Sequence, residues 1–283
     1  MINMPRKLIL LLISAGLCFL AGCATNPITG EEEMMFSRDY RQDMEVGKQY
    51  APEVEKELKG RIDDQAVQSY IDSVGQKVAR VSHRPDFNYH FVAVNDRSIN
   101  AVSLPGGYIF ITKGLLLKLT SESQLASVLA HEVVHVAARD AENMMSKQAG
   151  IGVLFVLAVS QTKSQGVQAA ADLARQMLEL RYSREDEETA DIGGLDYMVR
   201  AGYDPNGMVE TIQMLEKEEM VRPTEFFSTH PSPENRLSYL KAKIQTRYSG
   251  AGAGSKAGRE DYERSVLDKM KSLPDSTGGP PNQ

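Results

Sequence analysis

Cysteine is nearly absent from this chain, which has 2 cysteines in 283 residues. They are Cys18 and Cys23, and both lie close to the amino terminus. The rest of the chain therefore offers no thiol for a disulfide, a catalytic nucleophile or a thiolate metal site. This absence excludes a cysteine protease.

Long hydrophobic runs are lacking as well. Residues 8–20 form an apolar run that is too short to span a bilayer comfortably as a permanent helix. Residues 151–159 form a shorter run, which predicts a buried helix or hairpin. The alternative for this second run is a flap or a membrane-touching element over a cleft.

The amino terminus has the pattern of a cleaved export signal. The basic pair Arg6-Lys7 precedes the apolar run, and Leu20-Ala-Gly-Cys23 provides the small-residue cleavage pattern. The segment resembles a bacterial lipoprotein signal, which implies that residues 1–22 are removed and that Cys23 carries the lipid anchor. An ordinary secretory signal would leave Cys23 unexplained. Ala24, by resemblance to lipoprotein sorting signals, favours the periplasmic face of the outer membrane.

Clustered basic residues and internal repeats are also missing. The net charge is −6, and no patterned basic stretch indicates a nucleic-acid partner. No repeat of the 34-residue helical-hairpin type is visible. With 42% hydrophobic residues, the chain can bury the core of one domain.

The most informative stretch that is present is His131-Glu-Val-Val-His135. On an α-helix, positions i and i+4 share one face, so both imidazoles can bind one metal ion. Glu132 lies on the adjoining flank, where it can reach a water at an open coordination position and act as its base. The pattern predicts a catalytic zinc site with one Zn²⁺ per chain. The alternative is an exposed helix with two hydrogen-bonded histidines.

The residues before this motif indicate a helix. Ser121-Glu-Ser-Gln124 is a capping-box start with an acidic first turn. Apolar residues then recur at helical spacing through Ala137, which predicts a helix that continues to about Lys147.

A catalytic zinc site needs a third protein ligand. Downstream, Glu187 and Asp191 form an i,i+4 carboxylate pair in a helical context. Glu187 is the candidate ligand. Asp191 could accept a hydrogen bond from a ligating histidine and fix its tautomer. The alternative is a solvated acidic helix face, which suits Glu185 and Glu188.

Two strands are predicted on either side of a turn. Residues 87–94 alternate as a half-buried strand, and residues 108–112 read as a second one after a Pro105-Gly-Gly turn. An edge strand beside the metal helix could hydrogen-bond an extended peptide.

At this point the sequence resembles the HtpX-like and CAAX-prenyl-protease-like gluzincin zinc metallopeptidases, in particular their periplasmic BepA- and LoiP-like lipoprotein branch without helical repeats. The likeness lies in residues 100–112, 131–135, 183–191 and 229–236. It implies one peptidase domain over residues 37–247 and assigns a zinc ligand to Glu187. One departure is Asp140, where relatives often carry a histidine; the position lies outside the ligand set.

The resemblance implies further roles. Asn100 and Ala101 would contact substrate, although an Asn before a strand can simply form a turn. His230 would face the metal, either as a donor to the oxyanion or as an occupant of the fourth metal position. Arg236 is expected in a structural ion pair near the site. His83 and His90 are expected to be non-ligands.

The predicted fold is an α+β, mostly α-helical, zincin-like domain with a small sheet whose edge strand binds substrate. The predicted divisions are a signal peptide (1–22), a tether (23–36), the peptidase domain (37–247), and a linker, short helix and tail (248–283). Periodicity places the other helices at about 37–59, 64–81, 167–182, 184–201, 205–220, 233–247 and 259–271.

The sequence predicts a zinc endopeptidase that cleaves unfolded or misfolded cell-envelope proteins. The alternative is a periplasmic chaperone or outer-membrane assembly factor that uses the same peptide-binding groove and rarely cuts. An intact Glu132 argues against pure binding, because binding alone needs no base.

Overall fold

The structure, a computed structural model, describes residues 22–25, 28, 30, 32–35, 40–147, 167–250 and 255–272. The apolar runs at residues 8–20 and 151–159 and the tail at residues 274–283 lie outside the described residues. Among the helices described, none is both long and apolar enough to cross a membrane.

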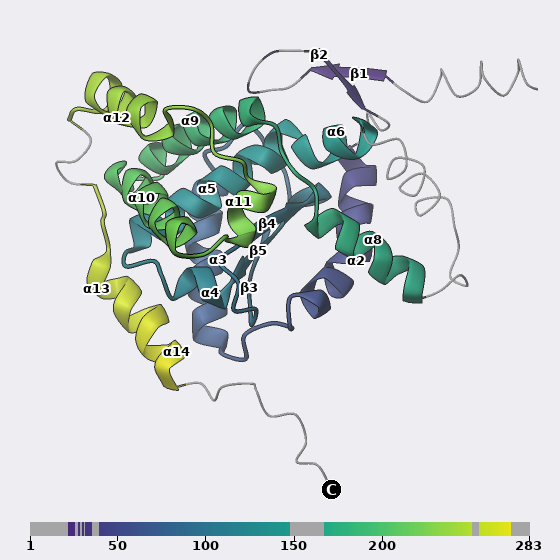
Figure 1. The fold of residues 1–283 in the computed structure, drawn as a ribbon, viewed down its shortest axis with the longest axis horizontal. Coiled ribbons are helices and arrows are strands. Elements are labelled where there is room, and N and C mark those ends of the chain that lie inside the picture. The colour runs from purple at the N-terminus through teal and green to yellow at the C-terminus, as the bar shows by residue number, and fades with distance from the viewer. Residues whose placement is uncertain are drawn as a thin grey trace, which may run out of the picture.

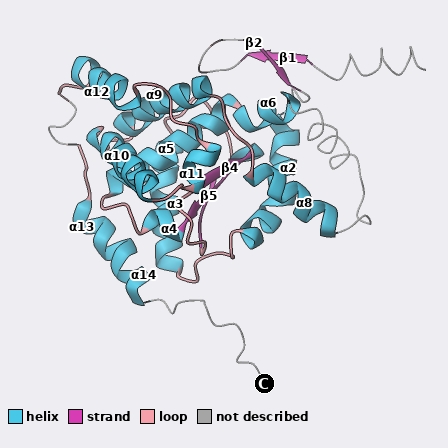
Figure 2. Ribbon diagram, in the orientation of Figure 1, coloured by secondary structure: helices cyan, strands magenta, loops and turns pink. Residues whose placement is uncertain are grey.

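A three-stranded sheet lies at the centre of the molecule, surrounded by helices (Figures 1 and 2). Its strands are β3 (His90–Val94), β4 (Ala101–Leu104) and β5 (Tyr108–Thr112), in the order β3-β5-β4. β3 is parallel and β4 antiparallel to β5. The sequence predicted β3 and β5 but not β4. β5 is central, and β4 is the edge strand that packs against α5; the predicted binding of substrate by an edge strand stays a prediction.

The turn between β4 and β5 depends on glycine. Pro105–Gly107 forms a short 3₁₀ turn in which Gly106 has a φ of 75° and Gly107 a φ of 98°. The predicted Pro-Gly-Gly turn is therefore confirmed. Both positions need glycine because residues with a side chain rarely adopt these left-handed conformations.

Helices cover both faces of the sheet, and successive strand residues point alternately into two cores. Phe91, Ala93 and Ile109 face the core that includes α3 (Gln65–Ala79) and α5 (Glu122–Ala138). Residues of the opposite face, such as Val92 and Phe110, join a second core with α2 (Tyr40–Glu57) and α8 (Val167–Leu178). The sheet is therefore buried on both sides and gives the metal helix α5 a rigid support.

The remaining elements agree with the predicted α+β, mostly helical class. They are β1 (Gly22–Thr25), β2 (Glu32–Met35), α2 (Tyr40–Glu57), α4 (Lys113–Leu116), α6 (Asp140–Lys147), α8 (Val167–Leu178), α9 (Arg184–Arg200), α10 (Asn206–Val221), α11 (Glu225–Thr229), α12 (Arg236–Arg247), α13 (Arg259–Tyr262), the π-helical η2 (Glu263–Leu267) and α14 (Asp268–Ser272). The short helices α4 and α11 were not predicted. The antiparallel pair β1–β2 falls, apart from Gly22, in the segment predicted as a tether (residues 23–36).

Three predicted helix boundaries were wrong. The helix expected over residues 167–182 ends at Leu178. The helix expected from Pro233 begins at Arg236, because Asn235 before it is left-handed with a φ of 59°. The metal helix does not run to Lys147: Arg139 has a φ of 62°, which ends α5, and α6 starts at the next residue. A buried ion pair between Arg139 Nη2 and Asp43 Oδ1, 2.9 Å apart, holds this break in place.

The crossing of α5 and α9 is unusually close. A Cβ built on Gly194 would lie 3.0 Å from the backbone nitrogen of His131, and one on Gly193 would lie 3.0 Å from a Val134 methyl. Glycine is needed here because its missing side chain lets the two helices approach. The contact brings the carboxylates of α9 within reach of the histidines of α5.

The carboxyl-terminal segment, residues 255–272, packs at the start of α5 (yellow in Figure 1). The backbone N–H groups of Glu122 and Ser123 donate to Gly258 and Ala257 at 3.2 and 3.0 Å, which satisfies donors that a helix start leaves open. The buried Glu122 carboxylate accepts from Lys256 Nζ at 2.7 Å. This segment thus stabilises the metal helix, and the predicted domain boundary at residue 247 stays a prediction.

Candidate metal centre

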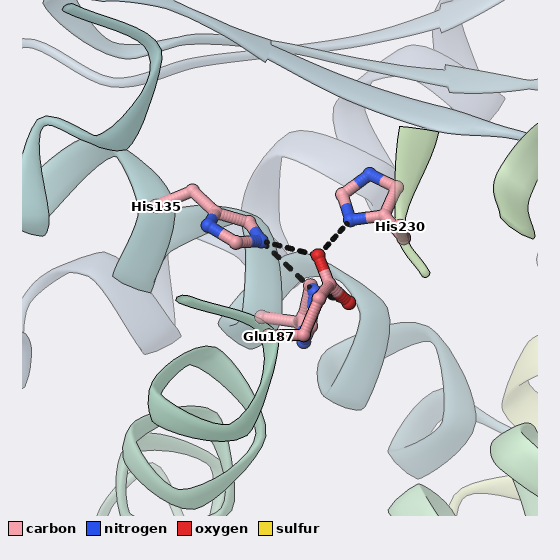
Figure 3. A group of neighbouring side chains, drawn as sticks. His135, Glu187 and His230 are labelled. Carbon is pink, nitrogen blue, oxygen red and sulfur yellow. Dashed lines mark hydrogen bonds and ion pairs between the residues drawn. The ribbon is translucent and has the colours of Figure 1, made fainter. Parts of the chain in front are cut away.

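Four buried side chains from three segments converge beside the sheet. α5 contributes His131 and His135, α9 contributes Glu187, and His230 directly follows α11. Each offers one possible ligand atom, and these atoms all lie within 4.8 Å of one another. Figure 3 shows His135 and His230 on either side of the Glu187 carboxylate.

The distances within this group are short. The two Nε2 atoms of His131 and His135 lie 3.1 Å apart. Glu187 Oε2 is 3.4 Å from His131 Nε2, and Glu187 Oε1 is 3.4 Å from His135 Nε2. Two nitrogens and a carboxylate therefore face a common point, which is the arrangement of a protein metal site.

A carboxylate holds the other ring nitrogen of each histidine. His131 Nδ1 lies 3.1 Å from Asp191 Oδ1, and His135 Nδ1 lies 2.7 Å from Asp140 Oδ2. An ionised carboxylate only accepts, so each Nδ1 carries the proton and donates. The lone pairs of both Nε2 atoms then point at each other, which is unfavourable unless a positive charge lies between them.

Asp140 is the partner that the sequence reasoning missed. It was noted only as a departure outside the ligand set. In a continuous helix, a residue five positions after His135 would point about 140° away from it around the axis. The left-handed residue Arg139, which separates α5 from α6, turns Asp140 back toward His135. The available signal in the sequence was a carboxylate five residues after His135, for which no other hydrogen-bond partner had been predicted.

The charges in the centre are set by these pairs. Burial alone would raise the pKa of Glu187, but His230 and His131 outweigh it and hold that pKa well below its usual value. Burial likewise opposes the charge on His135, yet Asp140 and Glu187 raise its pKa well above the usual range. The environment that attracts protons to the imidazoles also attracts a cation, so metal binding competes with protonation.

Glu132 supports the interpretation as a reactive site. Its side chain is fully buried, and neither carboxylate oxygen has a hydrogen-bond partner among the described residues. A buried carboxylate without a partner is costly, and such a group in a native protein commonly has a catalytic role. The donor set around it, two imidazoles and a carboxylate, suits Zn²⁺.

His230 lies against both acidic residues of the centre. Its Nδ1 donates to Glu187 Oε1 at 2.8 Å, and its Nε2 lies 3.6 Å from Glu132 Oε1. The ring stacks on Phe226, with centroids 4.6 Å apart. His230 is thus placed at the metal group, as the sequence predicted, although α11 before it was not foreseen.

Tyr182 is a further side chain that sequence reasoning missed. Its ring stacks on His135 with centroids 3.9 Å apart and an interplanar angle of 7°. Its backbone N–H donates to the Thr229 carbonyl at 3.0 Å, next to His230. Tyr182 therefore fixes one ligand ring and joins the His230 segment to the start of α9. Its place directly before the cap residue Ser183 was the only signal in the sequence.

Arg236 forms the expected ion pair. Its Nη2 donates to Asp191 Oδ1 at 2.6 Å, and the guanidinium, together with His131, lowers the pKa of Asp191 against the opposing effect of burial. His83 and His90 lie elsewhere: His83 contacts the hydroxyl of Tyr197, and His90 stacks on Tyr108. Neither belongs to the metal group among the described residues.

The two predicted substrate contacts lie at the start of β4. Asn100 is buried, and its Oδ1 has no hydrogen-bond partner among the described residues. Ala101 is fully buried, as are the other residues of β4. The substrate role of both residues stays a prediction.

Comparison with known proteins gives a consistent result. The model of the family described as "Peptidase family M48" matches residues 65–244. The chain is 31% identical over 212 residues to the "Beta-barrel assembly-enhancing protease" of Escherichia coli (strain K12), which covers 70% of this chain and 42% of that protein. It is 29% identical over 206 residues to the "Mitochondrial metalloendopeptidase OMA1" of Schizosaccharomyces pombe (strain 972 / ATCC 24843), which covers 70% of this chain and 61% of that protein. The chain thus spans under half the length of the bacterial relative.

The geometry predicts different effects for the carboxylates of the centre. Glu187→Ala should abolish stoichiometric metal binding, because it removes one of three ligands. Asp140→Ala and Asp191→Ala should weaken metal affinity by about 10–100-fold, because each only orients a ligand. Metal content by elemental analysis and affinity by competition with a chromophoric chelator would measure this. Glu188→Ala, at the exposed neighbouring position, is the matched control. Unchanged metal content in Glu187→Ala would place the third ligand elsewhere.

Proposed function

Since the chain belongs to peptidase family M48 and is a metallopeptidase, we propose that it is a zinc endopeptidase that hydrolyses peptide bonds in extended or misfolded cell-envelope proteins. The observation that carries the proposal is the buried Glu132, whose carboxylate accepts no hydrogen bond from the described residues, beside the converging His131, His135 and Glu187. Binding alone would not need a carboxylate in that position.

The proposed mechanism assigns a separate task to each side chain. When bound, zinc supplies a Lewis acid that polarises the scissile carbonyl and lowers the pKa of a water. His131, His135 and Glu187 would hold it. Glu132 takes the proton of the attacking water and passes it to the leaving amine. Asp191 and Asp140 keep both imidazoles in the tautomer whose Nε2 is free to bind metal.

An extended substrate suits the arrangement of the sheet. β4 is an edge strand next to α5, and Asn100 with its unpartnered Oδ1 lies at its start. An edge strand can hydrogen-bond an extended peptide and so favours unfolded segments over folded ones. The bacterial relative is named for assisting β-barrel assembly, which supports a role with envelope proteins. The competing proposal, a chaperone with little proteolysis, differs in whether Glu132 is needed.

Replacing Glu132 decides between these two functions. Glu132→Gln should retain the metal and lose cleavage of an unfolded protein such as casein by at least about 100-fold, because it removes the proton acceptor. Gel-based and mass-spectrometric assays, with and without a chelator, measure this. Retained cleavage with normal metal content would reject Glu132 as the base, and absence of cleavage by the metal-loaded wild type would favour the chaperone.

His230 is proposed to occupy the fourth metal position in a resting enzyme. Its ring offers a ligand atom to the metal group and contacts both Glu187 and Glu132, with Nδ1 2.8 Å from Glu187 Oε1 and Nε2 3.6 Å from Glu132 Oε1. A protease among unfolded envelope proteins needs such restraint. The alternative role, donation to the oxyanion of the transition state, remains compatible with the same position.

The two roles of His230 predict opposite changes in the cleavage rate of His230→Ala. A blocking residue should give faster casein cleavage, and self-cleavage, in His230→Ala. An oxyanion donor should instead cost about 10²–10³-fold in rate. Initial rates of wild type and variant at equal metal content measure the effect. A fall of that size would overturn the inhibitory role, and a rate within twofold of wild type would remove His230 from both roles.

The proposed location is the periplasmic face of the bacterial outer membrane, through a lipid on Cys23. This proposal depends on the amino-terminal pattern, since the side chain of Cys23 lies outside the described residues. Several acyl chains on one residue provide a stable anchor.

Removal of the anchor should change both processing and sorting. Cys23→Ala should abolish lipid attachment and leave an unprocessed or mis-sorted protein, because the lipidated side chain is missing. Membrane fractionation with mass spectrometry of the amino terminus measures this, and Cys18→Ala is the matched control. A normally processed Cys23→Ala protein in the outer membrane would contradict the lipoprotein assignment.

A further inference from the structure

The second edge of the central sheet, strand β3, borders a groove away from the metal centre. The groove has a cavity volume of about 460 Å³, within the range of about 300–1,000 Å³ that is typical of ligand sites. Helix α2 forms one wall and α3 the other, because the two helices cover opposite faces of the sheet (Figure 1). The metal helix α5 packs on β4, at the opposite edge. None of the residues that line the groove belongs to the metal group.

The outer side of β3 has one open position between two that are paired. Gln68 of α3 accepts from the Ala93 N–H at 3.0 Å and donates to the Ala93 carbonyl at 2.8 Å. Gln76, also on α3, donates to the Tyr89 carbonyl at 2.8 Å. Phe91 lies midway between Tyr89 and Ala93, so its N–H and C=O point to the same side, away from β5. These two groups have no hydrogen-bond partner among the described residues.

The open position calls for an occupant with a backbone of its own. A buried backbone N–H or C=O without a partner is costly, and the Phe91 residue is 4% exposed. An extended peptide laid beside β3 supplies one acceptor and one donor at the spacing that a strand edge requires. The edge lies between two helices, which would obstruct a strand that belongs to a second folded sheet. A free, extended segment fits this groove better than another folded protein does.

The two walls of the groove differ in polarity. Helix α3 contributes only polar side chains, namely Gln65, Gln68, Ser69 and Asp72. The α2 side contributes most of the apolar surface, namely Ala51, Pro52, Val92, Tyr108 and Phe110. Successive side chains of an extended peptide point to opposite sides. Every second side chain would therefore meet the apolar wall, and the others would meet the polar one.

The charged side chains at the groove favour neither sign of charge in the occupant. Lys48 and Arg61 are balanced by Glu55 and Asp72. Arg61 Nη2 already lies 3.1 Å from Glu55 Oε2. The groove therefore selects a peptide by the alternation of its side chains rather than by its net charge.

We propose that this groove is a second peptide site, which binds an extended segment with alternating apolar and polar side chains as an added strand beside β3. The segment belongs to a long substrate polypeptide, and this part rests on the proposed peptidase function. By holding one part of an unfolded chain, the groove raises the local concentration of the rest at the metal centre. A ten-residue peptide is at most about 35 Å long, so it can occupy the groove or the metal centre but not both.

Peptide binding is measured without cleavage, with the metal-loaded Glu132→Gln full chain. One fluorescent ten-residue probe alternates valine and serine, and the other has the same residues in two blocks. Anisotropy should show at least about tenfold tighter binding of the alternating probe, because the block sequence places valines on the polar wall. Bound probe should also slow hydrogen exchange of the Phe91 amide, read by NMR, because that amide gains an acceptor.

Replacements at the two walls locate the binding site. Ser69→Trp fills the groove from α3 and Pro52→Trp fills it from α2, and both positions are exposed, so neither change disturbs the core. Each should weaken binding of the alternating probe by at least about tenfold. Ser73→Trp is the matched control, because Ser73 is exposed on α3 one turn later and does not line the groove. Its affinity should stay within twofold of that of the unreplaced chain.

A kinetic measurement tests the link to the metal centre. In the chain that retains Glu132, kcat/KM is compared for casein and for a ten-residue peptide with one casein cut site. The ratio of casein to peptide should fall by at least about tenfold in Ser69→Trp, through KM, because only the long substrate uses both sites. The same ratio should be unchanged in Ser73→Trp.

Several results would overturn the second peptide site. They are equal binding of the two probes, unchanged affinity in both Ser69→Trp and Pro52→Trp, an equal loss in Ser73→Trp, and unchanged exchange of the Phe91 amide. Weakened probe binding with an unchanged casein ratio would reject the substrate-holding role. If metal-loaded wild type binds the alternating probe but cuts no unfolded protein, the peptidase function fails while the peptide site stands.

Discussion

The centre depends on two carboxylates that set the orientation of the imidazoles of His131 and His135. Asp191 reaches one ring from α9 and Asp140 reaches the other from α6, and each accepts the Nδ1 proton. Both Nε2 lone pairs are thereby directed to one point, with the two atoms 3.1 Å apart. The two lone pairs repel each other unless a cation or proton lies between them. The two aspartates therefore increase the affinity of the histidines for a metal. The carboxylate of Glu187 adds a negative charge at the same point and so increases this affinity further.

This geometry requires α5 to be held firmly on three sides. The central sheet supports one side, the close contact at Gly193 and Gly194 brings α9 against another, and residues 255–272 bind the start of the helix through Glu122. A larger residue at Gly194 would meet the backbone of His131 and push the ligand helix away. Packing far from the reacting atoms therefore controls distances at the metal, where small errors have large effects on rate.

The centre is closed, which limits the access of a substrate to its side chains. The metal-binding side chains and Glu132 are at most 4% exposed, so a polypeptide can reach them only if a covering segment moves. The segment with α11 and His230 lies against the centre, and its backbone is joined to a neighbouring segment by the bond from Phe226 N–H to the Ile99 carbonyl at 3.1 Å.

What the sequence by itself determined is local in character. Histidines four residues apart share a helix face through the period of the helix alone, and the same rule pairs Glu187 with Asp191. The longer helices, two of the three strands of the central sheet and the α+β class followed from similar short-range patterns, and the family resemblance agreed with them. The tertiary structure decided the rest. Asp140 reaches its histidine only because the helix breaks at Arg139, whose ion-pair partner lies 96 residues earlier in the chain. The Tyr182 ring stacked on that histidine and the segment that carries His230 likewise lie where they do through contacts between segments far apart in sequence, and no local periodicity encodes such contacts.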